Sequence, residues 1–294
     1  MKILLTGATG FLGSAILKAL LKNNHEIIIL KRSFSDLRRI ASDIGQTAVY
    51  DIDQKNSLER IFCENKNIDA VLHTATCYGR KQESTLQIFN SNTFFPLEIL
   101  DYAAKNGVGS FINTGTLLPL TKQGQMHNYV LSKQQFLEWG RYYSQNINFI
   151  NMKLDYIYGP GDDKTKFLPL LIENCVKNAQ KINLTKGGQK RDFIYISDVV
   201  NAYLKIMETE NGSYEEFEIG TGRSIALKDA ALKIKEIAKS ATELNFGAVP
   251  YRKDEQMETK TDISKLLKLG WHPEYDFDKG IKEILSLEYS EDIK

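Results

Sequence analysis

The 294-residue sequence has no excess of charge of either sign, few cysteines and no long uncharged apolar run. Its formal net charge is +1, so nothing in the composition favours binding to nucleic acid or to an anionic membrane. The three cysteines stand far apart, which argues against a metal cage and for a reducing compartment. No uncharged apolar stretch reaches the roughly 18 residues that suggest a membrane-spanning helix, and the N-terminus lacks a signal pattern. We therefore expect a cytoplasmic protein with no metal, no nucleic-acid partner and no membrane partner.

The sequence also lacks internal repeats, low-complexity tracts and linkers rich in Pro, Gly and Ser. Its first half instead alternates short apolar strand patterns with helical patterns. Such alternation is typical of a parallel sheet with helices on both faces. The expected strands are 2–5, 26–30, 48–50, 70–73, 110–113 and 149–154, and the expected helices are 13–21, 35–44, 57–62, 86–104 and 128–144.

The regular alternation ends after residue 161, where helical patterns at 168–178, 198–207, 227–240 and 277–287 are separated by irregular segments. We therefore predict an α/β fold with a Rossmann-type, doubly wound parallel sheet over residues 1–155. A smaller C-terminal α/β substrate lobe should cover 156–294, with part of 190–210 returning to the first domain. The two parts are expected to share a cleft.

A glycine-rich turn follows the first expected strand. Gly7, Gly10 and Gly13 have the spacing Gly-x-x-Gly-x-x-Gly between that strand and a helical pattern. Here Gly7 would permit a tight turn, Gly10 would let phosphate oxygens approach the backbone, and Gly13 would let the helix pack closely on the sheet. The N-terminus of the helix then attracts a pyrophosphate. The pattern predicts a dinucleotide site, and a turn without a ligand is the alternative.

Two cations and a hydroxyl, Lys31, Arg32 and Ser33, follow the second expected strand. An NAD-selective site usually has an acidic residue here, which accepts hydrogen bonds from the ribose and repels a 2′-phosphate. Cations and a hydroxyl instead suit a phosphate, so we predict NADPH as cofactor; a solvated basic turn is the alternative. Asp51, after the third strand, is placed to accept a hydrogen bond from the adenine amino group, or it is an ordinary turn carboxylate.

Tyr129 and Lys133 are four residues apart at the start of an expected helix, so they share one helix face. Spacing alone proves little, because Tyr275 and Lys279 repeat it. The first pair is distinguished by its place after the strand 110–113, whose carboxyl end borders the ligand crevice of a doubly wound sheet.

Thr114 and Thr116 lie at that strand end, and either hydroxyl could hold a carbonyl oxygen. Tyr129 would then donate a proton as a ketone is reduced, while the Lys133 ammonium and the cofactor lower the pKa of the phenol. The predicted catalytic group is Tyr129, Lys133 and one of the two threonines, Thr114 or Thr116.

The chain resembles the extended short-chain dehydrogenase/reductases, which form the NAD-dependent epimerase/dehydratase family. The resemblance extends over nearly the whole chain, in the stretches Thr6–Gly13, Asp69–Ala75, Asn92, Tyr129 with Lys133, Tyr158–Gly161, Arg191–Asp198 and Ile219–Gly222. It implies a nucleotide-diphosphate sugar as substrate, held mainly by the C-terminal lobe, and a possible homodimer through helices that flank the sheet. The further cofactor contacts that it implies are Thr9, Phe11, Leu12, Ile52, Thr74, Ala75, Lys133 and Tyr156.

Two residues are assigned to the substrate by this resemblance. Arg191 matches the arginine that relatives use against the substrate diphosphate, and the alternative is a surface arginine paired with Asp192. Phe167 would line the sugar-nucleotide pocket, or it belongs to the core.

Two stretches, 30–36 and 111–119, resemble the bacterial CDP-sugar 4-ketoreductases, the abequose and paratose synthases of O-antigen lipopolysaccharide biosynthesis. Aligning Leu117 with the valine of the common Ser/Thr-x-x-Val-Tyr-Gly pattern makes Thr114 the catalytic hydroxyl and leaves Thr116 to contact substrate. Gly115 and Thr116 stand where dehydratase relatives have acids, so dehydration is not expected.

These resemblances predict NADPH-dependent reduction of the 4-keto group of a CDP-4-keto-3,6-dideoxyhexose. The alternatives are an NDP-sugar 4-epimerase with tightly bound NAD and a non-enzymatic, redox-sensing regulator on the same fold.

Overall fold

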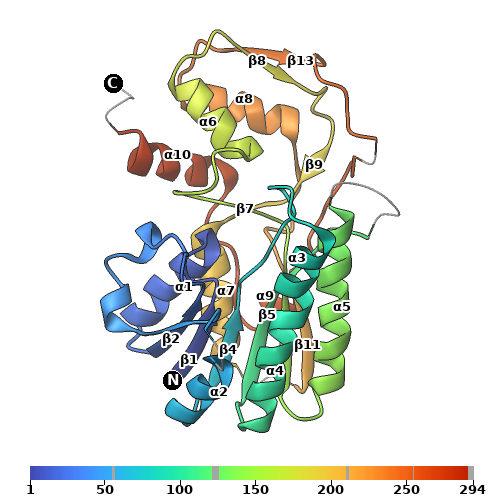
Figure 1. Ribbon diagram of the computed structural model, residues 1–294. Coiled ribbons are helices and arrows are strands. Elements are labelled where there is room, and N and C mark those ends of the chain that lie inside the picture. The colour runs from blue at the N-terminus through green and yellow to red at the C-terminus, as the bar shows by residue number, and fades with distance from the viewer. Residues whose placement is uncertain (55–56, 121–125, 210–211, 254, 291–294) are drawn as a thin grey trace. The chain divides into compact units, whose positions relative to one another are not determined.

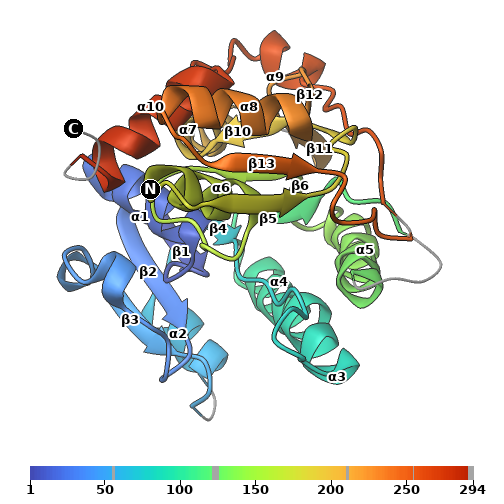
Figure 2. The ribbon, with the colours of Figure 1, turned by 90° about the horizontal axis from the view of Figure 1, so that it is seen from above.

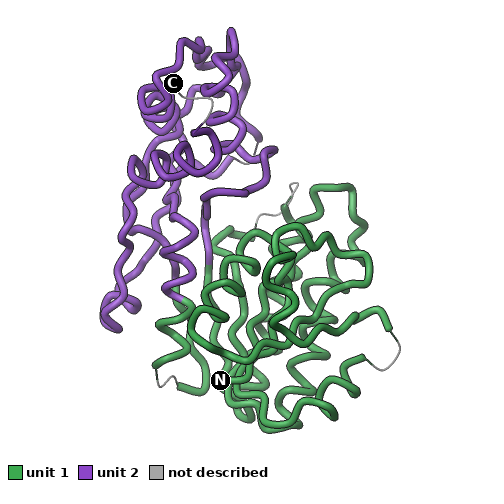
Figure 3. The backbone as a smooth tube through the Cα atoms, turned by 90° about the vertical axis from the view of Figure 1, so that its left-hand side faces the viewer, with its two compact units in different colours: residues 1–153, 203–217 green, residues 154–202, 218–294 purple. Residues whose placement is uncertain are grey.

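The computed structural model describes residues 1–54, 57–120, 126–209, 212–253 and 255–290, and it divides into two compact units (Figures 1 and 3). Unit 1 comprises residues 1–153 and 203–217, and unit 2 comprises 154–202 and 218–294. The chain thus leaves unit 1, returns to it once and leaves again. Over the described ranges, each helix is too short or too polar to cross a bilayer.

Unit 1 is built on a seven-stranded sheet with the strand order β11-β6-β5-β4-β1-β2-β3 (Figure 2). The neighbours from β3 to β5 run parallel. The order reverses between β1 and β4, the switch point at which doubly wound sheets bind ligands. The strands are β1 (Lys2–Thr6), β2 (Glu26–Lys31), β3 (Ala48–Asp51), β4 (Ala70–His73), β5 (Ser110–Thr116), β6 (Asn148–Leu154) and β11 (Tyr214–Ile219).

The central strands are apolar on both faces, as a sheet covered by helices on both sides requires. On one face, Leu4 of β1 shares a buried cluster with Leu100 and Phe136 of two helices that pack together (Figures 1 and 2). A third helix packs on β1 and β2. The predicted Rossmann-type sheet is therefore confirmed. The helices are α1 (Phe11–Lys22), α2 (Ser57–Glu64), α3 (Thr85–Phe89), α4 (Phe95–Lys105) and α5 (His127–Tyr143).

The expected helix at 35–44 is wrong. Two short 3₁₀ turns, η1 (Arg38–Ile40) and η2 (Ile44–Gln46), stand there instead. Ile40 is the one buried residue of the two turns, so the segment offers no apolar face whose packing would stabilise an α-helix.

The helix expected at 86–104 is present but irregular. Between α3 and α4 the backbone widens into a π-helical segment, η3 (Asn90–Phe94). Such segments are rare and often occur at functional sites, and this one carries the fully buried Asn92.

Unit 2 is an α/β lobe made of three short strand pairs and several helices. Two pairs, β7 with β10 and β8 with β13, are parallel, and β9 with β12 is antiparallel. Sequence patterns did not predict these strands, because each has only two to four residues and shows no alternating run. The elements are β7 (Tyr156–Tyr158), α6 (Phe167–Val176), β8 (Lys181–Leu184), β9 (Lys190–Arg191), β10 (Phe193–Tyr195), α7 (Ile196–Met207, which ends in unit 1), β12 (Ile225–Ala226), α8 (Leu227–Ile237), β13 (Glu243–Phe246), α9 (Ser264–Lys268) and α10 (Phe277–Glu288).

Candidate active site

The glycine-rich turn joins β1 to α1 at the switch point of the sheet. Gly7 has a φ of +74°, which side chains disfavour, and a Cβ there would lie 2.5 Å from the backbone nitrogen of Ala75. A Cβ at Gly13 would overlap the Gly7 carbonyl oxygen. Thr74 completes the contact, because its hydroxyl donates to the Thr6 carbonyl oxygen over 2.7 Å. The turn is therefore held directly against the end of β4.

The outer side of this turn is open. Gly10 is exposed, and a Cβ there would have one neighbour within 4 Å in the described part of the chain, the Gly7 carbonyl oxygen at 3.2 Å. Gly10 is also the N-cap of α1 and provides no side-chain cap, so Phe11 and Leu12 begin the helix without one. A bare helix N-terminus beside an uncrowded glycine suits a pyrophosphate. The residues present thus fit a dinucleotide cofactor.

Three groups predicted to contact the cofactor form contacts with one another or with Asp53: Lys31 and Ser33, predicted at its 2′-phosphate, and Asp51, predicted at its adenine. Lys31 and Asp51 are register partners on β2 and β3, and the Lys31 ammonium lies 2.5 Å from the Asp51 carboxylate. The Ser33 hydroxyl donates to Asp53 over 2.6 Å. The Arg32 guanidinium is exposed and lies 4.7 Å from the centroid of the Phe34 ring. Of the two predicted cations, Lys31 and Arg32, Arg32 is therefore the more accessible.

Ile52, another predicted cofactor residue, directly follows β3. Its backbone N–H donates to the Lys31 carbonyl oxygen over 2.8 Å. This bond extends the pairing of β2 and β3 by one residue and holds Ile52 beside the basic turn.

Lys133 ties α5 to the end of β5. Its ammonium is buried and donates to the Thr114 carbonyl oxygen over 3.0 Å. Burial lowers the pKa of Lys133 to about 8, because an apolar environment disfavours the charged form.

Tyr129 lies one helical turn before Lys133 and is also buried. Burial raises the pKa of its phenol above the usual value, the nearby Tyr78 acts in the same direction, and hydrogen bonding to Thr116 and Thr76 opposes the rise. The expectation that the protein lowers the pKa of the Tyr129 phenol is therefore wrong for the protein's own groups. The physical reason is that desolvation dominates, while the Lys133 ammonium is directed at a backbone carbonyl.

Side chains alternate along β5 and give its two faces different roles. Thr114 and Thr116 share one face, where the Thr114 hydroxyl lies 2.7 Å from the Tyr203 hydroxyl and Thr116 lies near the Tyr129 phenol, whose pKa it helps to lower. On the opposite face, Asn113 donates to the side-chain oxygen of the buried Asn151 over 2.8 Å. The structure thus places both threonines beside tyrosine hydroxyls.

Asn92 joins α5 to the loop that follows β4. Its side chain accepts from the Cys77 backbone nitrogen over 2.7 Å and donates to the Cys77 carbonyl oxygen and to Ser132 over 2.8 and 3.0 Å. This loop carries Tyr78, whose ring packs on Tyr129 with centroids 5.0 Å apart. Tyr78 has no signal in the sequence, since an isolated loop tyrosine resembles any surface residue.

Arg191 in unit 2 is 4% exposed, so the alternative of a surface arginine paired with Asp192 is wrong. Its guanidinium lies 2.6 Å from the Glu255 carboxylate and 5.2 Å from the centroid of the Tyr156 ring. Asp192 instead accepts from the Thr221 backbone N–H and hydroxyl. The buried Arg191 thus has an internal counter-ion in Glu255.

Two more side chains of unit 2, Asp155 and Phe167, are partly buried. Asp155, directly before β7, has a buried carboxylate oxygen without a hydrogen-bond partner among the described residues, and burial raises its pKa to about 6. Phe167 begins α6 and is half-buried, whereas the next residue, Leu168, is buried. Phe167 therefore keeps part of its ring accessible.

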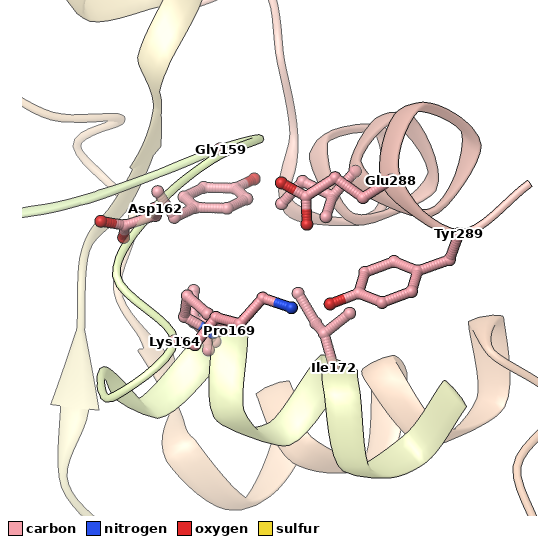
Figure 4. A pocket seen from close by; sticks show the side chains of 10 residues that line it. Gly159, Asp162, Lys164, Pro169, Ile172, Glu288 and Tyr289 are labelled. Carbon is pink, nitrogen blue, oxygen red and sulfur yellow. The ribbon is translucent and has the colours of Figure 1, made fainter. Parts of the chain in front are cut away.

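A small cavity in unit 2 lies between the loop after β7 and the helices α6 and α10 (Figure 4). Its volume of about 10 Å³ has room for about one water molecule. Lys164 points toward the ring of Tyr289, and the Gly161 N–H donates to the Glu288 carboxylate. The cavity is too small for a sugar nucleotide.

The second Tyr-x-x-x-Lys match has a structural role. The Lys279 ammonium lies 4.0 Å from the centroid of the Tyr275 ring and donates to the Glu274 carbonyl oxygen. The Tyr275 ring stacks on Tyr195. The pair stabilises the start of α10, and its lysine caps a ring face rather than a phenol oxygen.

Two curated relatives match almost the whole chain. A CDP-abequose synthase of Salmonella muenchen is 37% identical over 97% of each chain. A putative UDP-glucose 4-epimerase of Methanocaldococcus jannaschii is 26% identical, also over 97% of each chain.

Solved structures share the fold. A UDP-glucose 4-epimerase of Thermotoga maritima, solved with UDP-glucose, has a TM-score of 0.83 at 23% identity and covers 97% of this chain and 98% of its own. A model of the NAD dependent epimerase/dehydratase family matches residues 3–220. The chain therefore belongs to the NAD-dependent epimerase/dehydratase family and has the extended short-chain dehydrogenase/reductase fold.

Proposed function

We propose that the protein is an NADPH-dependent reductase of the 4-keto group of a CDP-4-keto-3,6-dideoxyhexose, as in O-antigen biosynthesis. The observation that carries this proposal is the 37% identity to a CDP-abequose synthase over nearly the full length. The contacts among Thr114, Thr116, Tyr129 and Lys133 support it, because they place a phenol and hydroxyl donors at one strand end.

The chemistry follows from these side chains. When bound, NADPH supplies the hydride that adds to C4 of the sugar. The Tyr129 phenol stays protonated at neutral pH because burial raises its pKa, and it donates its proton to the oxygen as negative charge develops there. A threonine hydroxyl donates a second hydrogen bond to that oxygen. Lys133 supplies positive charge one helical turn away.

Binding is proposed for residues of both units. In unit 1, the pyrophosphate would lie on the glycine-rich turn, beside Thr9, Phe11, Leu12, Thr74 and Ala75. In unit 2, Arg191 would meet the substrate diphosphate, with Phe167 near the sugar nucleotide and Tyr156 near the cofactor. The permanent charge of Arg191 suits this role, and the diphosphate would share or replace Glu255 as its counter-ion.

Position 115 favours reduction over dehydration. A Cβ on Gly115 would lie 2.5 Å from the side-chain oxygen of Asn151, which is itself held by Asn113. An acidic side chain therefore has no space there without displacing a buried amide. A 4-epimerase with tightly bound NAD remains the alternative reaction, supported by the 26% identity to a putative UDP-glucose 4-epimerase. A redox-sensing regulator would have no need for Tyr129 beside Lys133.

The direct test is incubation of the purified protein with NADPH or NADH and a panel of NDP-4-keto sugars, with products identified by NMR. We expect a C4 alcohol from the CDP-4-keto-3,6-dideoxyhexose. Tyr129→Phe should keep cofactor binding and lose at least about 100-fold in kcat, since general acid catalysis contributes about that much. Full activity of this variant would show that another group donates the proton.

Replacement of Arg32 tests the choice of cofactor. A charge-assisted bond to the 2′-phosphate is worth about 1.5–3 kcal/mol, so Arg32→Ala should raise the KM for NADPH by about 10- to 100-fold and leave that for NADH unchanged. Arg38→Ala is the matched control, because Arg38 is exposed and pairs with Asp36. Equal effects of both variants on NADPH would refute the assignment.

The buried ammonium predicts a pH dependence of stability. The pKa of Lys133 is about 8 in the folded chain against 10.5 for a free lysine, so the unfolded chain binds more protons between these values. The free energy of unfolding should therefore rise with pH across this window, by up to about 3 kcal/mol relative to Lys133→Met. Denaturant titrations of the ligand-free proteins from pH 7 to 10.5 measure the difference. A constant difference would contradict a buried charge.

We also propose a homodimer through α3, α4 and α5. Trp139 and Tyr142 on α5 are 44% and 63% exposed, and Phe94 at the end of η3, which packs on α5, is 48% exposed. Sedimentation equilibrium should show a dimer that Trp139→Glu dissociates, because a charge would be buried in the interface. Leu232→Glu, at an exposed position of α8, should leave the dimer intact. A monomeric wild-type protein would contradict the proposal.

A further inference from the structure

Tyr203 is a fully buried tyrosine whose hydroxyl contacts a proposed catalytic residue. It lies in the part of α7 that belongs to unit 1, 89 residues from Thr114 in sequence, and the two hydroxyl oxygens are 2.7 Å apart. Thr114 itself is only half-buried. The pair therefore links a buried phenol to a hydroxyl at the accessible end of β5.

The direction of this hydrogen bond decides what Thr114 can do. Each hydroxyl has one proton and can also accept. A phenol is the stronger donor and the weaker acceptor of the two, because its oxygen lone pairs are delocalised into the ring. The favoured arrangement has Tyr203 donating to the Thr114 oxygen. The proton of Thr114 is then left to point away from Tyr203, and a donor in such a chain is strengthened by the bond that it accepts.

We propose that Tyr203 is a positioning residue that directs the hydroxyl proton of Thr114 toward the keto oxygen of the substrate. Tyr203 has no exposed surface and so acts through Thr114 rather than on the substrate. The inference rests on the proposed reduction of a sugar ketone and deepens it.

This arrangement also separates the roles of the two threonines. The Thr116 hydroxyl accepts from the Leu118 N–H over 3.2 Å and lies near enough to the Tyr129 phenol to oppose the rise in its pKa. Thr114 has a phenol donor behind it and its own proton available. Thr114 therefore holds the keto oxygen, and Thr116 orients the proton donor Tyr129.

A double-mutant cycle between Tyr203→Phe and Thr114→Val tests the proposal. Tyr203→Phe keeps the ring that fills the core and removes only the hydroxyl, and circular dichroism and the melting temperature verify its folding. We expect kcat to fall about 3- to 10-fold, the value of one hydrogen bond, with the KM for the sugar nucleotide unchanged. In the Thr114→Val background the same change should alter kcat by less than about twofold. With Thr114→Ser, which keeps a hydroxyl, the full effect should return.

Two kinetic outcomes would overturn the inference. An unchanged or higher kcat of Tyr203→Phe would show that Thr114 donates to Tyr203 or does not depend on it. An equal loss of kcat in the Thr114→Val background would show that Tyr203 acts only through the general packing of the core.

Crystal structures of the wild type and of Tyr203→Phe separate this inference from the proposed function. We expect the Thr114 hydroxyl to leave its wild-type rotamer when the phenol oxygen is removed, and an unchanged rotamer would overturn the inference. A wild-type protein that turns over no nucleotide sugar would refute the proposed function alone, and the structures would still decide the role of Tyr203.

Discussion

The hydrogen bond from the buried Lys133 ammonium to the Thr114 carbonyl oxygen is the constraint on which the candidate site depends. A charged group in an apolar environment is costly unless it is hydrogen-bonded, so this bond fixes the start of α5 against the end of β5. Tyr129 lies one helical turn from Lys133, and Thr116 lies two residues from Thr114 along the same strand face. One contact between a helix and a strand thus determines where the phenol and both hydroxyls stand.

The surrounding residues keep that contact rigid by satisfying buried polar groups. Asn92 in the π-helical segment bonds to the loop after β4 and to Ser132 on α5. On the far face of β5, Asn113 and Asn151 pair with each other. A buried network of this kind is stable only when most of its members have partners, and it specifies one arrangement of the elements. The site is therefore held from both faces of β5.

The features of the fold and the candidate site that could be predicted from sequence depend on local backbone geometry and on topology. The glycine-rich turn needs only the strand before it and the helix after it, and the place of Tyr129 follows from strand order in a doubly wound sheet. The side-chain contacts that could not be predicted from sequence depend on strand register and on residues far apart in the chain. Lys31 meets Asp51 because β2 and β3 pair in that register, and Tyr203 meets Thr114 across 89 residues. The helix expected at 35–44 is absent for a different reason: the segment buries only Ile40 and so has no apolar face whose packing would stabilise a helix.

In the proposed reaction, the side chains of β5 and α5 deliver one proton to a sugar oxygen while an exchangeable cofactor is consumed. The most direct measurement of this reaction uses NADPH that carries deuterium at the transferable position of the nicotinamide, with the CDP-4-keto-3,6-dideoxyhexose as substrate and mass spectrometry of the sugar as readout. A reductase incorporates one deuterium at C4 for each NADPH oxidised. A product that interconverts at C4 without taking deuterium from added NADPH would contradict the account and indicate an epimerase that retains its own NAD.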